Sequence, residues 1–188
     1  MIEAALFITP DAFDNWLTKN GHVEKEIWLR LSKKSAKPQT LNYQQALTVA
    51  LCWGWIDGVK QADSDEHFLQ RFTPRKPSSS WSLINRTKAE ELIEQGKMNS
   101  AGLAEIEKAK ANGLWDKAYA GSASIEVPDD LQKALEANTK AAAQFKTLNR
   151  QNRFAILYRI GNVKRAETRA KKIKDFVAML ARGEKLYP

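Results

Sequence analysis

The sequence predicts an α+β fold, in which a small antiparallel sheet packed with helices is followed by an all-helical carboxy-terminal part. Segments of strand-like composition lie in the first half of the 188 residues, at 26–31, 55–59 and 67–72. The second half consists of helical segments, and a linker of small and turn-forming residues is predicted within 113–128. We therefore expect an α+β core domain over 1–120 and a helical carboxy-terminal subdomain over 121–188.

The first predicted elements are a helix and a strand. Asp11 can cap a helix that runs to about Lys19, and the Gly21 turn ends it. From Ile27 to Leu31, apolar residues alternate with others, which is typical of a strand with one buried face.

The next predicted helix, 43–54, is the clearest amphipathic helix of the first half. Its apolar residues fall at helical spacing and Asn42 can cap it. We expect a buried face made by Tyr43, Leu47, Ala50 and Leu51 to pack on a sheet that includes 26–31 and 67–72. The strands at 55–59 and 67–72 should form an antiparallel pair, joined by an acidic loop.

Further helices are predicted from capping and stop signals. One of Ser78, Ser79 and Ser80 should cap a helix that ends before Gly96. The remaining helices are expected at 100–112, 129–137, 139–149, 151–160 and 165–181.

The composition is that of an ordinary soluble globular protein, with 43% hydrophobic and 28% charged residues. No apolar run approaches the roughly 18 residues that a membrane-spanning helix needs. The first residues lack the basic segment of a secretory signal, and the single cysteine, Cys52, excludes an internal disulfide. We therefore expect a cytoplasmic protein without a transmembrane segment.

The net charge of +8 is unevenly distributed. Residues 1–69 hold 7 Lys/Arg and 9 Asp/Glu, whereas the 43 residues from Lys146 hold 12 and 3. This asymmetry favours an anionic partner, such as nucleic acid, an acidic protein or phospholipid headgroups. The alternative is that the cations only solubilise the outer faces of the terminal helices.

The usual catalytic motifs do not occur. HExxH, CxxC, GxSxG, GxxxxGK[ST] and GxGxxG are all missing, which argues against the zinc, hydrolase, P-loop and Rossmann classes. Cys52 is expected in a core, and Asp57 before Gly58 is typical of a turn. We expect no cofactor, no metal and no assigned catalytic residue.

The segment 51–86 is the strongest candidate for a ligand site. It contains three of the six tryptophans together with three arginines, and it leads into a predicted helix whose amino terminus offers free amides. The predicted pocket, which would bind a small anion, comprises Trp53, Trp55, Asp57, Arg71, Arg75, Trp81, Ser82 and Asn85. Trp81 and Asn85 are expected on one helical face. The alternative is that the tryptophans fill a core and the serines only cap the helix.

The last helix offers a second candidate surface. Arg165, Arg169 and Lys172 form a basic stripe for a polyanion. Ile173, Phe176, Val177 and Leu180 form an apolar stripe that faces either the core or a partner. Nucleic-acid, membrane-surface and protein partners therefore remain open.

Four ordered motifs carry a resemblance to a known family. They are ALCWGWIDG at 50–58, RFTPRKPSSSWS at 71–82, EQGKMNSAG at 94–102 and AETRAKKIKDFVAMLARG at 166–183. The chain resembles the YdeI/OmpD-associated, or bacteriocin-protection, family over nearly its whole length. The resemblance implies a cytoplasmic or envelope-associated bacterial protein, loosely linked to resistance against bacteriocins or antimicrobial peptides, without established catalytic residues.

These observations lead to three hypotheses. The first is a non-enzymatic binding or stress protein of the YdeI/OmpD-associated type with a Trp/Arg anion pocket. The second is an enzyme that acts on a small anionic substrate at that pocket. The third is a nucleic-acid-associated protein that uses the basic terminal helices.

Overall fold

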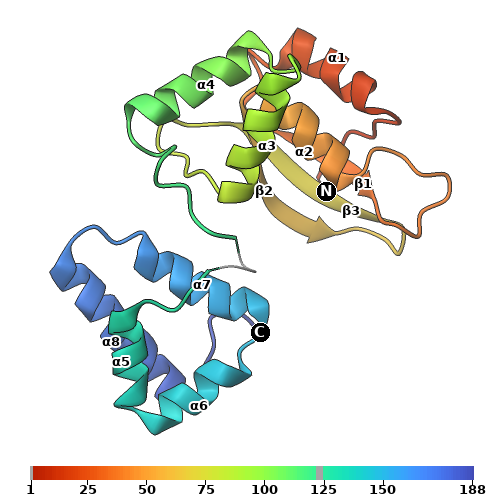
Figure 1. Ribbon diagram of the computed structural model, residues 1–188. Helices are drawn as coiled ribbons and strands as arrows, with labels where there is room; N and C mark the ends of the chain where they lie inside the picture. The colour runs from red at the N-terminus through yellow and green to blue at the C-terminus, as the bar shows by residue number, and fades with distance from the viewer. Residues whose placement is uncertain (1, 122–124) are drawn as a thin grey trace. The chain divides into compact units, whose positions relative to one another are not determined.

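The computed structural model describes residues 2–121 and 125–188, and these fall into two compact units, Met1–Ala118 and Tyr119–Pro188. The amino-terminal unit combines a three-stranded sheet with helices, and the carboxy-terminal unit is helical in its described part (Figure 1). The predicted α+β class and all-helical carboxy-terminal part are confirmed. The predicted linker includes Ser122, Ala123 and Ser124, which lie outside the described residues.

The described elements follow the predicted order closely. The amino-terminal unit contains α1 (Pro10–Asn20), β1 (Ile27–Ser32), α2 (Tyr43–Cys52), β2 (Trp55–Ala62), β3 (His67–Pro74), α3 (Leu83–Glu94) and α4 (Ser100–Ala111). The carboxy-terminal unit contains α5 (Asp129–Glu136), α6 (Thr139–Thr147), α7 (Arg150–Gly161) and α8 (Ala166–Ala181).

The sheet is antiparallel with the order β1-β3-β2. β2 and β3 form the predicted hairpin, and β3 also pairs with β1 from Ile27 opposite Phe72 to Ser32 opposite His67. The register of β2 shifts between Asp57 and Lys60. The buried Gln70 amide donates to the carbonyl of Gly58 at this irregularity, so the backbone there keeps a hydrogen-bond partner.

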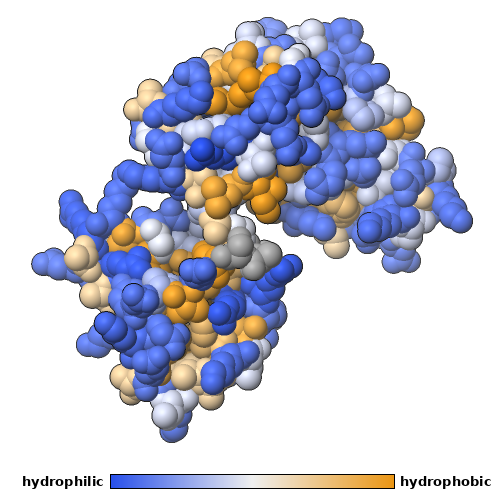
Figure 2. All heavy atoms as spheres, viewed as in Figure 1, coloured by the Kyte–Doolittle hydropathy of each residue, from blue (hydrophilic) through white to orange (hydrophobic). Residues whose placement is uncertain are grey.

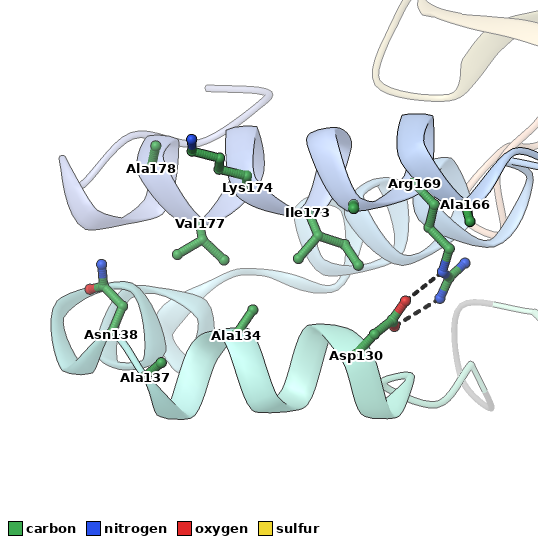
Figure 3. Close-up of a pocket in the computed structure, with 11 residues that line it drawn as sticks. Asp130, Ala134, Ala137, Asn138, Ala166, Arg169, Ile173, Lys174, Val177 and Ala178 are labelled. Atoms are coloured by element: carbon green, nitrogen blue, oxygen red, sulfur yellow. Dashed lines mark hydrogen bonds and ion pairs between the residues drawn. The ribbon is translucent and has the colours of Figure 1, made fainter.

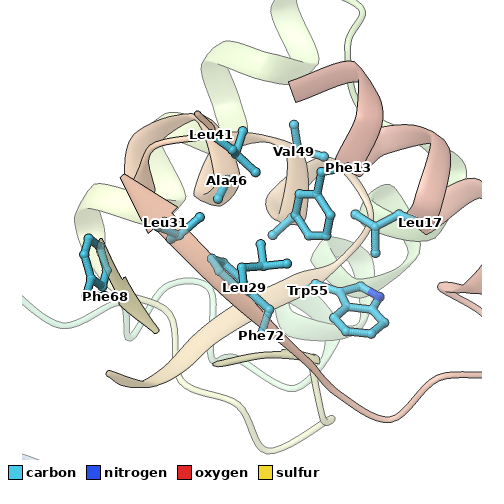
Figure 4. Packing of buried hydrophobic residues seen from close by; sticks show 11 residues of the cluster. Phe13, Leu17, Leu29, Leu31, Leu41, Ala46, Val49, Trp55, Phe68 and Phe72 are labelled. Carbon is cyan, nitrogen blue, oxygen red and sulfur yellow. The ribbon is translucent and has the colours of Figure 1, made fainter. Parts of the chain in front are cut away.

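One face of the sheet is covered by α1 and α2. Their side chains pack with those of β1 and β3 in a single apolar cluster (Figure 4), whose buried members are Phe13, Leu17, Leu29, Leu31, Leu41, Ala46, Val49, Ala50, Trp55, Phe68 and Phe72. The apolar residues that alternate from Ile27 to Leu31 face this cluster, so β1 has the one buried face that the alternation predicted.

Helix α2 is buried on two sides, which corrects the predicted packing. Ala46, Val49 and Ala50 face the sheet, whereas Leu47 and Leu51 belong to a second cluster shared with α3 and α4. The predicted face had placed both leucines against the sheet. The difference arises because a helix that is apolar around most of its circumference can bury two faces at once.

The carboxyl end of α2 meets the amino end of α4 at very short range. The Asn99 amide donates to the Cys52 carbonyl at 3.0 Å. Gly102 lies beside the same carbonyl, where an added Cβ would overlap the backbone. Gly54, with φ of 73°, turns the chain into β2 at this point. Two glycines therefore permit the close approach of these elements.

Two helix caps differ from those predicted. Thr9, not Asp11, caps α1 by accepting a hydrogen bond from the Ala12 amide at 3.3 Å. Ser82, not one of the three preceding serines, caps α3 by accepting from the Asn85 amide at 3.2 Å. Trp81 therefore precedes the helix and does not share a helical face with Asn85. Runs of several capping residues leave this choice to tertiary packing.

The carboxy-terminal unit is built around α8, which packs against α5, α6 and α7. Its core includes Leu131, Phe145, Ile156, Ile173 and Leu180, which are all buried. The buried Asn152 of α7 both donates to and accepts from the backbone of Tyr187, so the last residues of the chain are attached to this core.

Truncation of Leu47 tests the position of the α2–α3–α4 cluster. Leu47→Ala should lower the free energy of unfolding by about 2–5 kcal/mol, because this side chain is almost fully buried. Gln44→Ala, on the exposed side of the same helix, is the control and should change stability by less than about 0.5 kcal/mol. A loss for Leu47→Ala no larger than for the control, measured by denaturant titration, contradicts this packing.

The contact between α2 and α4 is tested by adding one methyl group. Gly102→Ala should destabilise the protein by about 1–3 kcal/mol, because the new Cβ would displace the Cys52 carbonyl. Gly161→Ala adds a methyl group in α7 where no atom lies within 4 Å, and it should stabilise by about 0.5–1 kcal/mol. Equal effects of the two substitutions would show that α4 does not approach α2 this closely.

Candidate functional site

One candidate site is a groove of about 700 Å³ between α5 and α8. In Figure 3, Ile173 and Val177 project from α8 towards α5, and Ala134 projects from α5 towards α8. The full set of lining residues is Asp130, Ala134, Ala137, Asn138, Ala166, Arg169, Ala170, Ile173, Lys174, Val177 and Ala178. The groove is therefore predominantly apolar, with a polar group at each end.

The sequence of α8 explains why a groove forms here. Ala166, Ala170, Lys174 and Ala178 recur every four residues, so they lie along one side of the helix. Ile173, Phe176 and Leu180 lie on another side and are buried in the core. Three of the four residues on the first side are alanines, which leave space beside α5 that larger side chains would fill. The predicted apolar stripe of α8 thus serves mainly the core, and Val177 lies at its edge in the groove.

An ion pair closes one end of the groove. The Arg169 guanidinium donates to both carboxylate oxygens of Asp130, with Nε–Oδ2 and Nη2–Oδ1 distances of 2.5 and 2.9 Å, and to the Ile160 carbonyl at 2.8 Å. The hydrogen bond from Arg169 lowers the pKa of Asp130, and the same bond raises the pKa of Arg169. This arginine therefore connects α5, α7 and α8.

The predicted basic stripe of the last helix is divided by this ion pair. Arg169 is engaged with Asp130, whereas Arg165 is exposed just before α8 and Lys172 is half-buried. Replacing Arg169 would leave the Asp130 carboxylate without this partner. We therefore expect substitution of Arg169 to lower the stability of the fold. Polyanion binding by the three residues stays a prediction.

Nearly all of the net charge belongs to the unit that contains the groove. Residues 119–188 hold 14 Lys/Arg and 7 Asp/Glu, whereas residues 1–118 hold 16 and 15. Hydrophilic residues cover most of the visible face of this unit, and hydrophobic residues are exposed between them (Figure 2). An apolar groove within a unit of net positive charge favours ligands that combine apolar and anionic groups.

Part of the predicted Trp/Arg pocket comes together around Trp81. The Arg75 guanidinium lies 3.5 Å from the centre of the Trp81 ring and donates to the Ser80 carbonyl at 3.3 Å. Trp81 in turn meets Trp115 edge-on, with ring centroids 4.7 Å apart. Arg75 and Trp81 are 6% and 2% exposed, so this cluster is almost closed to solvent. Trp115 was missed because it lies far along the sequence in the predicted linker.

The other predicted pocket residues lie elsewhere. Trp55 is part of the cluster beneath α1 and α2, and the Trp53 indole donates to Asp14 at 2.7 Å. Asp57 accepts from the Tyr43 hydroxyl at 3.0 Å and therefore faces α2. Phe72 is the cross-strand partner of Asp57, so these two side chains lie on the same face of the sheet. Successive side chains of a strand alternate between faces, and Arg71 therefore lies on the other face.

Arg71 and the start of α3 also have structural partners. Arg71 forms an ion pair with Glu26 at 3.4 Å, and the Ser82 hydroxyl is occupied by the Asn85 amide. Asp57 thus pairs with a tyrosine and not with an arginine. The eight residues do not line one described pocket, and their role in binding an anion stays a prediction.

Cys52 lies at the end of α2 in the cluster shared with α3 and α4. Burial, followed by the nearby Asp14 carboxylate, raises the pKa of its thiol. A raised pKa lowers the thiolate fraction at neutral pH, which agrees with the core role predicted for this residue. Within residues 2–121 and 125–188, no cluster of His, Cys, Asp and Glu is arranged to hold a metal ion.

Comparison with family models covers both units. Residues 124–183, which include the whole groove, match the family described as "Bacteriocin-protection, YdeI or OmpD-Associated". The carboxy-terminal unit therefore carries a domain of the YdeI/OmpD-associated type. Residues 5–105 match a second family, a domain of unknown function (DUF8412), so the motifs at 50–58, 71–82 and 94–102 fall within that match.

No curated protein and no solved structure matches the chain. Among the described residues, no helix is both long and apolar enough to cross a membrane. The absence of a transmembrane helix agrees with the sequence-based prediction, and the cytoplasmic location stays a prediction.

The ion pair at the end of the groove predicts a pH-dependent stability. A carboxyl with a lowered pKa stabilises the fold above its ordinary pKa, and this contribution disappears as the pH falls through the lowered value. The difference in unfolding free energy between the wild type and Asp130→Asn should thus be largest near pH 7 and vanish at strongly acid pH. Because the Asp130 side chain is 46% exposed, we expect only about 0.5–1 kcal/mol of coupling with Arg169.

A double-mutant cycle of Asp130→Asn and Arg169→Gln, followed by denaturant titration at several pH values, measures this coupling. Glu184→Gln is the control, since Glu184 and Arg182 form an exposed pair two residues apart. A coupling between Asp130 and Arg169 that is zero, or that persists unchanged at acid pH, would rule out the ion pair as the link between α5 and α8.

Proposed function

We propose that this protein is a non-enzymatic binding protein of the YdeI/OmpD-associated type whose carboxy-terminal unit holds a helix of an acidic partner protein in the groove between α5 and α8. The observation that carries the proposal is the apolar groove itself, which lies within the family match and within the basic unit. Amphipathic helices commonly bind by placing their apolar face in such a groove.

The lining of the groove supports a helix better than a small polar molecule. Small-molecule sites usually contain several convergent polar groups that fix the orientation of the ligand. Here Asp130 and Arg169 already satisfy each other, and most other lining groups are methyl or methylene groups. Alanines at 134, 137, 170 and 178 allow a third helix to approach α5 and α8 closely.

The positive charge of the carboxy-terminal unit supports an acidic partner. Lys174 lines the groove and is exposed, and the surrounding unit holds twice as many cationic as anionic residues. Acidic residues on the polar face of a bound helix would meet this positive field, which also increases the rate of association. Membrane-active peptides of the cationic amphipathic class would be repelled. We therefore propose that any role in bacteriocin protection depends on an acidic protein partner and not on direct capture of a cationic peptide.

The proposal is tested with the full chain and a labelled synthetic helix. The probe is a peptide of about 18 residues with leucines at i, i+3, i+4 and i+7 and glutamates on the other face. Ala170→Trp fills the groove without changing its charge, and it should weaken binding by at least about tenfold, or roughly 1.4 kcal/mol, in fluorescence anisotropy. Ala143→Trp, on the exposed side of α6, is the matched control and should bind as the wild type does.

Two results would contradict the proposal. Binding that is equally strong for Ala170→Trp and Ala143→Trp would place the partner outside the groove. The nucleic-acid hypothesis would be favoured if the protein retained nucleic acid more tightly than the peptide and Ala170→Trp did not change that retention. In that case Arg165→Gln/Lys172→Gln should reduce the salt dependence of nucleic-acid binding. The slope of log affinity against log salt concentration should change by about 0.9 per lost phosphate contact. Turnover of a small anionic substrate would favour the enzyme hypothesis.

A further inference from the structure

We infer that the amino-terminal unit contains a second binding site, which takes a small aromatic anion such as an aryl carboxylate or an aryl phosphate monoester. The site is a cleft of about 430 Å³ where the loop after β1, the first residues of α2 and the start of β3 meet. Its lining residues are Ser32, Lys33, Lys34, Gln39, Asn42, Tyr43, Gln44 and Phe68. This inference is independent of the groove in the carboxy-terminal unit.

The cleft is positively charged without a lining carboxylate. Lys33 and Lys34 are its only charged lining residues, and Lys33 is fixed by a 2.6 Å hydrogen bond to the Ser64 carbonyl. Asp57 accepts from Tyr43, Asp63 pairs with Arg30, and Glu66 accepts from the Lys37 amide, so these three carboxylates have other partners. Two lysines in the lining of the cleft therefore favour an anion.

An aromatic wall adjoins these cations. Phe68 is 7% exposed and stands at the margin of the apolar cluster, away from Phe13 and Leu17 (Figure 4). The Lys60 ammonium lies 4.0 Å from the centre of the Phe68 ring, so this ring already contacts a cation. With the ring of Tyr43 also in the lining, the cleft offers aromatic surface next to positive charge. A ligand that joins an aromatic ring to an anionic group matches both features.

The polar groups of the cleft divide into fixed and available ones. Asn42 and Gln45 cap α2 reciprocally, so we do not assign recognition of the anion to the helix amino terminus. Ser32 is hydrogen-bonded to Thr40 at 2.7 Å. The side-chain amide of Gln44 makes no hydrogen bond to another described residue, and it lines the cleft beside the lysines. Lys34 and Gln44 are thus the groups most available to a ligand.

The test compares phenyl phosphate with inorganic phosphate by isothermal titration calorimetry of the full chain. Phenyl phosphate should bind at least about tenfold more tightly, because only its ring reaches the aromatic wall. Lys33→Gln/Lys34→Gln should weaken phenyl phosphate at least about tenfold through the loss of two cations. Lys37→Gln, on the same loop but outside the cleft lining, is the matched control and should bind as the wild type does. Circular dichroism and thermal melting establish that each variant is folded.

Phe68→Leu supplies a second readout that does not depend on the charge. It should reduce the preference for phenyl phosphate over inorganic phosphate while leaving the affinity for inorganic phosphate unchanged. Equal affinities of the two compounds for the wild type, absence of binding by both, or an equal loss in Lys33→Gln/Lys34→Gln and Lys37→Gln would each overturn the inference.

Discussion

Each unit is organised around one central helix that packs against several neighbouring elements at once. In the amino-terminal unit α2 packs on the sheet and α1 with one side and on α3 and α4 with the other. This arrangement requires small residues where backbones approach, which explains Ala46 and Ala50 towards the sheet and Gly102 opposite the end of the helix. In the carboxy-terminal unit α8 has the same central position, with contacts to α5, α6 and α7.

The candidate groove follows from the difference between these two central helices. Helix α2 is covered on both of its apolar sides, whereas α8 presents a line of small residues beside α5 that the described residues do not cover. The ion pair between Asp130 and Arg169 holds the two helices together at one end and neutralises the only carboxylate in the lining. The remaining surface is apolar within a basic unit, and that combination supports an acidic amphipathic helix as the occupant.

Local sequence signals predicted the elements well because spacing and capping act within a few residues. The strand from Ile27, the helix from Tyr43 with its Asn42 cap, and the hairpin between β2 and β3 all depend on such signals. The signals failed where the choice depends on distant contacts. The packing of Leu47 towards α3 and the caps Thr9 and Ser82 are examples, since neighbouring residues offered equally good local alternatives.

Candidate sites were harder to predict than elements for the same reason. The partner of Arg169 lies 39 residues away in Asp130, so a basic stripe read from α8 alone could not reveal that its central member is paired. Trp81 and Arg75 are close in sequence and lie in contact, but Trp115 and Trp55 are distributed by tertiary packing into different clusters. The groove itself requires two helices to be brought together, and neither sequence segment indicates it alone.

The most direct measurement of the central claim is the position of an acidic amphipathic helix on the full chain, determined by intermolecular nuclear Overhauser effects to isotope-labelled methyl groups. Binding in the groove predicts contacts from the leucines of the helix to the methyl groups of Ala134, Ala170 and Val177. Contacts confined to other methyl groups, such as those of the exposed Ile84 and Leu103 in the amino-terminal unit, would contradict it.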